Sequence, residues 1–438
     1  MQTNTNEFPE VLEQIESASR EYLDSHQDAA IQAIVSYAFK HSPLVGKVWR
    51  DAGIVPGDIK SVSDFREKAP FLDKDVVRSY RDEHNDPRGG MSIDRPGETV
   101  SVGTTSGTTG DPTPVANWRR TPADVTFSRD FWHIGVRPGD YIANIMFTYR
   151  GGHRRRSMSE LGVAEIAFSM SPMALPRIVE ASKRFRPTAV SILPNPLILG
   201  LEQYFEKTGE DPIDVFSSYR GAIFGGEPLS NRLKNLTASW GLEVFETTSL
   251  GDVAGATMCK AKDGFHAYED VAFIETVDPI TSEPIPDGEI GELVVTSLID
   301  YLSPLIRYRT GDLVRIDRSP CACGRTHARF HLLGRATDQI LVEGRSVLPR
   351  ELMAHVELES ETRGNLFQII RTDREMSSLK LRVGYDVSRL KGDQKDLQGR
   401  LSDRLYEALS IPVEITLVDE QELLKLGPPH KIPRVTKS

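Results

Sequence analysis

Residues 219–252 read YRGAIFGGEPLSNRLKNLTASWGLEVFETTSLGD, and this stretch holds the pattern that decides the fold. Two apolar runs, GAIF and LEVFET, enclose NRLKNLTASWG, a mostly polar segment with the length of a surface helix. A strand, a helix and a second strand in this order predict a right-handed βαβ unit with parallel strands.

The same alternation extends towards the N-terminus as far as Asp140. YIANIMF (141–147) and TAVSILP (188–194) read as strands, and LPRIVEASKRFRP (175–187) and PLILGLEQYFEKTG (196–209) read as helices. Repeated βαβ units predict an α/β fold with a mostly parallel sheet.

The pattern changes twice after this region. Beyond Asp263, the runs AYEDVAFIETVDP, GEIGELVVTSL and LVRIDR predict short strands and turns of a small barrel-like portion. Beyond LLGRATDQ, the runs DQILVEG, LKLRVGYDV and LSDRLYEALS predict a compact α+β module. We therefore expect a large N-terminal domain over residues 1–335 and a small C-terminal domain over residues 336–438.

Composition excludes several classes of protein. The chain has 438 residues and a formal net charge of −10, which argues against a general nucleic-acid or membrane-surface binder. The N-terminal MQTNTNEFPE lacks a secretion signal's apolar run, and no apolar run approaches the ~20 residues of a membrane helix. Three cysteines do not make a disulfide framework. We expect a cytoplasmic protein that binds neither nucleic acid nor membrane.

A hydroxyl-rich stretch, SVGTTSGTTGDPTPV (101–115), has two interpretations. It is either a surface turn or a loop that wraps phosphates, because glycines let the backbone approach an anion closely and successive N–H groups bind it. It is not a Walker loop, since no Lys-Ser/Thr pair follows the glycines.

Carboxylates follow two of the expected strands. Glu227 in AIFGGEPLS and Asp252 in FETTSLGDV lie just past apolar runs, at the sheet edge where α/β proteins bind ligands. A carboxylate beside a phosphate loop can hold Mg²⁺. Further on, PLIRYRTGDL offers Arg307, Arg309 and Asp312 for ribose or phosphate. Taken singly, each of these is better explained by an ordinary turn or a surface ion pair.

The three cysteines lie in two short segments. CKAKDGFH holds Cys259 and His266, and PCACGRTH holds Cys321 and Cys323. Three thiols and an imidazole complete a tetrahedral structural zinc site with no open position. The alternative is three buried free thiols with a surface histidine.

Several motifs follow one another along the chain: the loop at 101–115, FGGEP, TTSLGD, YRTGD, LGRATDQILVEG and HKIPRVTKS. Their order and rough spacing resemble those of the adenylate-forming superfamily of acyl-CoA synthetases and ligases. Thr113 stands where many members carry Lys, so the phenylacetate–CoA ligase branch is the nearest resemblance. AFKHSPLVGKVWRDAGIVPGDIKSVSDF and GVRPGDYIANIMF are similar to that branch as well, and the resemblance spans about residues 30–437.

The resemblance implies roles for individual residues. Lys431 matches the C-terminal lysine that the small, mobile domain swings over the reacting carboxylate, Asp252 the magnesium-binding carboxylate, and Arg335 the hinge arginine. Asp312 matches the ribose-binding aspartate. The ATP- or AMP-binding residues are then Thr105, Ser106, Gly107, Thr108, Thr109, Gly110, Gly225, Gly226, Glu227, Thr247, Thr248, Ser249, Asp312 and Arg335.

This chain departs from the superfamily pattern in two places. Where the family has Tyr-Gly-x-Ser/Thr-Glu, residues 248–252 read TSLGD, so an adenine-stacking Tyr is replaced and the metal ligand is shortened to Asp252. Asp and Glu are both good ligands for Mg²⁺. At the hinge, Thr337 stands where Asp is usual.

The acid pocket is expected around FTYRGGHRRRSMSELGV. Phe147, Tyr149, Arg150 and Gly251 would line it, with aromatic walls that suit a flat acid. The basic run from Arg150 to Arg156 either pairs with an anionic substrate group or is a solvated loop.

These interpretations converge on an acid–CoA ligase that forms AMP. The implied reaction turns a carboxylic acid, expected to be aromatic, and ATP into acyl-AMP and pyrophosphate, and then passes the acyl group to CoA. The expected cofactors are ATP, Mg²⁺, CoA and structural Zn²⁺, and the resemblance implies a homodimer. A carrier protein or an amine as acceptor, or a weakly active nucleotide-binding relative, remain alternatives.

Overall fold

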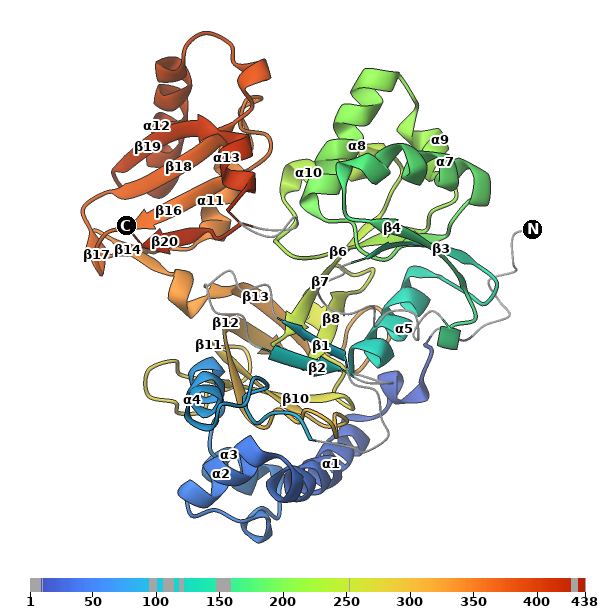
Figure 1. Cartoon of the computed structure of the whole chain (residues 1–438), viewed down its shortest axis with the longest axis vertical. Coiled ribbons are helices and arrows are strands. Elements are labelled where there is room, and N and C mark those ends of the chain that lie inside the picture. The colour runs from blue at the N-terminus through green and yellow to red at the C-terminus, as the bar shows by residue number, and fades with distance from the viewer. Residues whose placement is uncertain are drawn as a thin grey trace.

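The computed structural model describes residues 9, 11–93, 101–104, 114–117, 122–146, 159–251, 253–426 and 432–437. Their strands form one large mixed sheet and three smaller sheets, with helices packed around them (Figure 1). Among these residues, no helix combines the length and the apolar character that crossing a membrane requires. A cytoplasmic location stays a prediction.

One half of the large sheet is parallel, which confirms the expected βαβ organisation. Its strands lie in the order β4-β3-β5-β6-β7, and every neighbouring pair runs parallel. These strands are β3 (Tyr141–Met146), β4 (Ala164–Ser169), β5 (Ala189–Val190), β6 (Gly221–Phe224) and β7 (Val244–Leu250).

Helices cover both faces of this parallel half. Alternate side chains of β6 divide between them: Ala222 and Phe224 share a core with α7 and α8, whereas Ile223 packs with α5 on the other face. Gly209 ends α8 with a φ of 71°, and the Ser230 side chain caps α10 by accepting from the Leu233 N–H. The helices are α5 (Pro122–Ile134), η5 (Pro172–Ala174), α7 (Leu175–Phe185), α8 (Asn195–Thr208), α9 (Pro212–Phe216) and α10 (Asn231–Ser239).

The other half of the sheet is antiparallel and continues from β7. The portion expected to be barrel-like is thus joined to the parallel strands in one sheet of eleven strands among the described residues. From β7 outward its strands are β8 (Ala254–Met258), β9 (Phe265–His266), β13 (Arg329–Arg335), β12 (Tyr308–Asp317), β11 (Ile290–Ser297) and β10 (Ala272–Val277).

One expectation about β7 is wrong. The expected strand LEVFET ends at Thr247, but β7 runs on through Thr248 and Ser249 to Leu250. Its last residues pair antiparallel with β8, with Thr248 opposite Ala256. β-Branched threonines favour this extended pairing.

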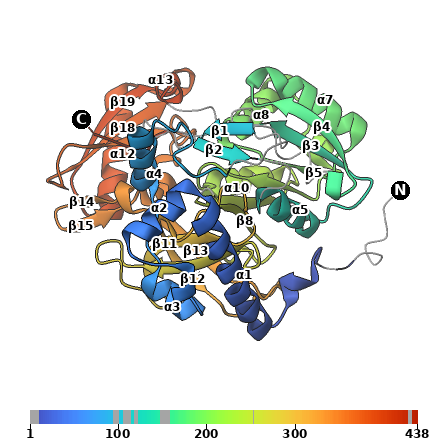
Figure 2. The ribbon, with the colours of Figure 1, turned by 60° about the horizontal axis from the view of Figure 1, so that its bottom comes forward.

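The N-terminal helices cover the antiparallel half. Ile31, Trp49 and Phe65 share a buried core with Phe273 and Val314, and Figure 2 shows these helices in front of β11–β13. They are η2 (Gln14–Ser17), α1 (Arg20–His41), α2 (Pro43–Asp51), η3 (Pro56–Asp58), α3 (Val62–Lys68) and α4 (Lys74–His84). A separate antiparallel pair, β1 (Ser101–Thr104) and β2 (Pro114–Asn117), flanks the hydroxyl-rich loop.

Residues after Arg335 form the expected α+β portion, drawn orange to red in Figure 1. Leu352, Phe367, Leu381 and Leu401 belong to a core made only of residues from this part. Its strands are β14 (Ile340–Val342), β15 (Arg345–Val347), β16 (Phe367–Arg371), β17 (Glu375–Met376), β18 (Leu379–Tyr385), β19 (Val413–Asp419) and β20 (Val435–Lys437). Its helices are η6 (Ala336–Asp338), α11 (Pro349–Val356), η7 (Val387–Arg389), α12 (Gln394–Leu409) and α13 (Glu420–Leu424). The domain boundary at Arg335 stays a prediction.

Candidate active site and metal centre

The loop after β6 lies directly against β7. A Cβ added at Gly225 would lie 2.8 Å from Thr247 Cγ2, so only glycine allows this approach. Gly226 has a φ of 108°, which again favours glycine. The buried Glu246 carboxylate accepts from the Leu229 N–H at 3.1 Å and fixes the end of this loop. Two of the segments expected to bind nucleotide are therefore held side by side.

Glu227, which we expected on the adenine side, turns its carboxylate towards the C-terminal part. Glu227 Oε1 accepts from the Ile432 N–H at 3.1 Å, and Oε2 accepts from Arg434 Nη2 at 2.6 Å. No local pattern in the sequence indicates these partners. They lie more than 200 positions further along the chain, and only the fold brings them together.

Asp312 and Arg335 lie opposite each other on β12 and β13. Asp312 Oδ1 is 3.3 Å from Arg335 Nε, and the Asp312 side chain is the more buried of the two. The expected ribose ligand and the expected hinge arginine therefore form an ion pair. Gly251 comes close to the same strand: with a φ of 57°, its position would place a Cβ 3.1 Å from Thr310 Cγ2.

Thr248 and Ser249 lie in β7 and pair with Ala256 and Gly255 of β8. The other expected site residues lie outside the described residues: Thr105, Ser106, Gly107, Thr108, Thr109, Gly110, Phe147, Tyr149, Arg150, Asp252 and Lys431.

The four expected metal ligands come together. Cys259 follows β8, His266 lies in β9, and Cys321 and Cys323 lie in the turn between β12 and β13. Cys259 Sγ is 3.6 Å from Cys321 Sγ, and Cys323 Sγ is 3.4 Å from His266 Nε2. All four donor atoms lie within 4.8 Å of one another.

This spacing fits a tetrahedral metal site. With Zn–S bonds of about 2.3 Å, neighbouring sulfurs in a tetrahedron lie about 3.8 Å apart. The sulfurs are too far apart for a disulfide, whose S–S bond is about 2.05 Å. His266 is fully buried, so the surface position that the alternative gave this histidine is wrong.

The protonation of His266 and Cys323 also suits a metal. Burial lowers the pKa of His266, which keeps its imidazole neutral. Its Nδ1 lies 3.2 Å from the His327 carbonyl, which can only accept, so the proton is on Nδ1 and the Nε2 lone pair faces the sulfurs. A hydrogen bond from the Cys259 thiol lowers the pKa of Cys323 and favours its thiolate, the form that binds metals.

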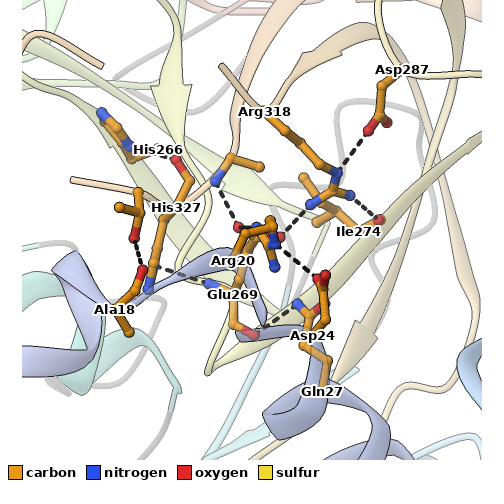
Figure 3. A network of polar contacts seen from close by, with 12 residues as sticks. Ala18, Arg20, Asp24, Gln27, His266, Glu269, Ile274, Asp287, Arg318 and His327 are labelled. Carbon is orange, nitrogen blue, oxygen red and sulfur yellow. Dashed lines mark hydrogen bonds and ion pairs between the residues drawn. The ribbon is translucent and has the colours of Figure 1, made fainter. Parts of the chain in front are cut away.

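A buried network behind His266 holds this arrangement (Figure 3). The Glu269 N–H donates to His327 Nδ1 at 3.2 Å. The fully buried Glu269 carboxylate accepts from Arg20 Nη1 at 2.7 Å and from Arg318. The network therefore ties α1 to the turn after β9, the strand that carries His266, as groups behind a metal-binding histidine commonly do to fix its ring.

Arg325, also missed by sequence reasoning, lies between the cysteines and the N-terminal segment. It is almost completely buried, donates to Tyr268 Oη at 3.1 Å and lies 4.0 Å from the Glu16 carboxylate. Charged residues at these positions look like surface residues in the sequence, because nothing local marks an arginine or glutamate as buried.

Comparison with known proteins gives a consistent result. No protein-family model matches the chain. It is 27% identical to the phenylacetate-coenzyme A ligase of Thermus thermophilus, over 96% of this chain and 96% of that protein. It is 28% identical to the phenylacetate-coenzyme A ligase of Pseudomonas putida, over 93% of this chain and 92% of that protein.

Among solved structures, the chain resembles a 2-hydroxyisobutyryl-CoA ligase at 23% identity. In the postadenylation state that ligase gives a TM-score of 0.83, over 99% of this chain and 94% of that one. With acyl-AMP and CoA in the thioesterification state it gives 0.68, over the same shares of the two chains. The expected fold and the expected resemblance are both confirmed.

Proposed function

We propose that this chain, an adenylate-forming enzyme of the phenylacetate–CoA ligase branch, is an acid–CoA ligase that forms AMP. In the first step the substrate carboxylate attacks the α-phosphorus of ATP, acyl-AMP forms, and pyrophosphate leaves. In the second step the CoA thiolate attacks the acyl carbonyl, the thioester forms, and AMP leaves. The observation that carries this proposal is similarity over nearly the whole chain to curated phenylacetate–CoA ligases.

The described residues support a nucleotide site between β6, β7 and β12. Asp312 would accept from the ribose hydroxyls, and Gly225 and Gly226, whose loop packs against β7, would lie along the adenine side of the site. Arg335, at the end of β13 and paired with Asp312, would couple this site to the hinge that follows. Thr247, Thr248 and Ser249 would line the site from β7.

The remaining roles rest on the sequence resemblance. Residues 105–110 would bind the β- and γ-phosphates, and Asp252 would hold Mg²⁺, which screens the phosphate charge. Phe147, Tyr149, Arg150 and Gly251 would surround the acid. Lys431, carried by a C-terminal domain that swings about Arg335, would stabilise the charge that grows on the transferring oxygens.

We further propose that Cys259, His266, Cys321 and Cys323 hold a structural Zn²⁺. Four protein donors leave no open position for a substrate, so the ion would hold together the turn between β12 and β13 and the ends of β8 and β9. Its role would be structural, and no step of the reaction passes through it.

Acid-dependent exchange between ATP and pyrophosphate tests this function. The assay uses phenylacetate, other aromatic acids and short hydroxy acids, each with and without CoA. Exchange with one acid, and an acyl-CoA product only when CoA is present, would support the ligase and name its substrate. Exchange without a thioester would favour a carrier protein or an amine as acceptor. No exchange despite ATP binding would favour a weakly active relative. The implied homodimer is tested by the molar mass in solution.

A further inference from the structure

The Glu227 carboxylate binds one short segment of the C-terminal part with both of its oxygens. Oε1 accepts from the backbone of Ile432 at 3.1 Å, and Oε2 pairs with Arg434 Nη2 at 2.6 Å. The Glu227 side chain is 8% exposed and the Arg434 side chain is 11% exposed, so water screens this pair less than a surface ion pair. A partly buried, charge-assisted contact of this kind is specific in its geometry.

Each side of the contact is fixed within its own part of the molecule. Arg434 Nη1 donates to the Asn365 carbonyl at 2.7 Å, and its guanidinium lies 4.6 Å from the centre of the Phe367 ring. The Ile369 N–H donates to the Arg434 carbonyl at 2.7 Å. On the other side, the buried Glu246 holds the end of the Glu227 loop. The contact therefore exists in one relative arrangement of the two parts and breaks when either part turns.

We propose that Glu227 is a positioning residue for the adenylation step. This inference rests on the proposed function. Lys431 directly precedes Ile432 in the sequence, and Glu227 holds the Ile432 backbone and Arg434 against the nucleotide-binding part. Glu227 thereby acts through Lys431 and selects the arrangement for the first half-reaction. The better superposition on the postadenylation state than on the thioesterification state agrees with this.

Other ion pairs between the two parts provide a matched control. Glu206 on α8 pairs with Arg363 at 3.1 Å and with Arg389 at 2.8 Å. This pairing involves neither the Glu227 loop nor the segment from Ile432 to Arg434. Glu206→Gln therefore weakens docking of the same two parts without touching the Glu227 contact.

The test compares Glu227→Gln, Arg434→Gln, the double variant and Glu206→Gln in two half-reactions. For both single variants we expect kcat of ATP–pyrophosphate exchange to fall about tenfold with KM for ATP unchanged. Thioester formation from supplied acyl-AMP should stay within about twofold of wild type. The double variant should be no slower than the singles, because both remove one interaction. Glu206→Gln should leave exchange within about twofold of wild type.

Three results would overturn the inference: unchanged exchange in Glu227→Gln, equal loss in both half-reactions, or a raised KM for ATP at unchanged kcat. A raised KM for ATP at unchanged kcat would mean that Glu227 contacts the adenine instead. Amide hydrogen exchange at Ile432 gives a readout independent of activity, since this N–H donates to Glu227. It should become faster in Glu227→Gln and not in Glu206→Gln, even if the wild type activates no acid and the proposed function fails. Equal rates in both variants would contradict the contact.

Discussion

Asp312 and Arg335 face each other across β12 and β13, with Asp312 Oδ1 3.3 Å from Arg335 Nε. The proposed ribose-binding carboxylate is thus paired with the last residue of β13, directly before η6 and the C-terminal part. This ion pair holds the Asp312 carboxylate beside the end of β13. Under the proposed function, this one contact would join the ribose site to the start of the C-terminal part.

Asp312→Asn should raise KM for ATP about tenfold, because a neutral amide accepts more weakly from ribose hydroxyls and loses Arg335. Steady-state kinetics with the preferred acid would measure this. Asp317→Asn is a matched control: Asp317 also lies on β12 and pairs with an arginine of β13, Arg329, at 2.8 Å, but at the far end of the strand. An equal rise in both variants would mean that the strand pairing, and not a ribose contact, is responsible.

The parallel half of the sheet could be predicted because long apolar runs alternate with helical segments between Asp140 and Thr248. The course of β7 could not, because its extension to Leu250 depends on pairing with β8 across a tight turn at Gly251. The residues of β7 alone do not indicate which strand pairs with its end.

The cluster of Cys259, His266, Cys321 and Cys323 could be predicted from the sequence because the three cysteines and the histidine lie in two short segments. The contact between Glu227 and Arg434 could not, since its residues are separated by 207 positions and each alone looks like a surface charge. Pairing at such separation is a property of the folded chain.

Removal of the metal should destabilise the protein. Cys321→Ser leaves three donors, so the purified variant should contain much less than the one zinc per chain expected of wild type, and its melting temperature should fall by several degrees. Metal analysis and thermal unfolding measure both quantities. A chelator should lower the melting temperature of wild type but have no further effect on Cys321→Ser. Wild-type protein that contains no zinc and melts identically with and without chelator would remove the proposed site.

Stability should depend on pH through Asp130. Burial raises the pKa of this carboxyl to about 6, although Tyr268 Oη and Thr257 Oγ1 both donate to it, at 2.7 and 2.8 Å. In the unfolded chain the pKa is about 3.9, so the folded state binds the proton more tightly. The stabilisation is complete below about pH 4 and is lost as the pH rises through about 6.

Asp130→Asn cannot titrate, so wild type should lose free energy of unfolding relative to this variant between about pH 4 and pH 6, and not above. Denaturant unfolding at several pH values measures the difference. Asp270→Asn should show the opposite pH dependence of the free energy of unfolding. Burial opposes ionisation of Asp270, but its two bonds to Arg129, both 2.8 Å, outweigh this and the pKa is lowered. Its stabilisation is therefore lost as the pH falls. The same slope in both variants would contradict these assignments.

Lys431→Ala should abolish acid-dependent ATP–pyrophosphate exchange, by about a hundredfold or more, because no other group is expected to supply the positive charge at the transferring oxygens. The second half-reaction, from supplied acyl-AMP and CoA, should proceed at nearly the wild-type rate, since the proposed swinging C-terminal domain would present a different surface in that step. Lys425→Ala, an exposed lysine just after α13, is the control and should leave both rates unchanged. Equal loss in both half-reactions would assign Lys431 a structural role, and unchanged exchange would exclude it from the adenylation site. Either result would also remove the basis for positioning by Glu227, because that contact acts only through the residue that precedes Ile432.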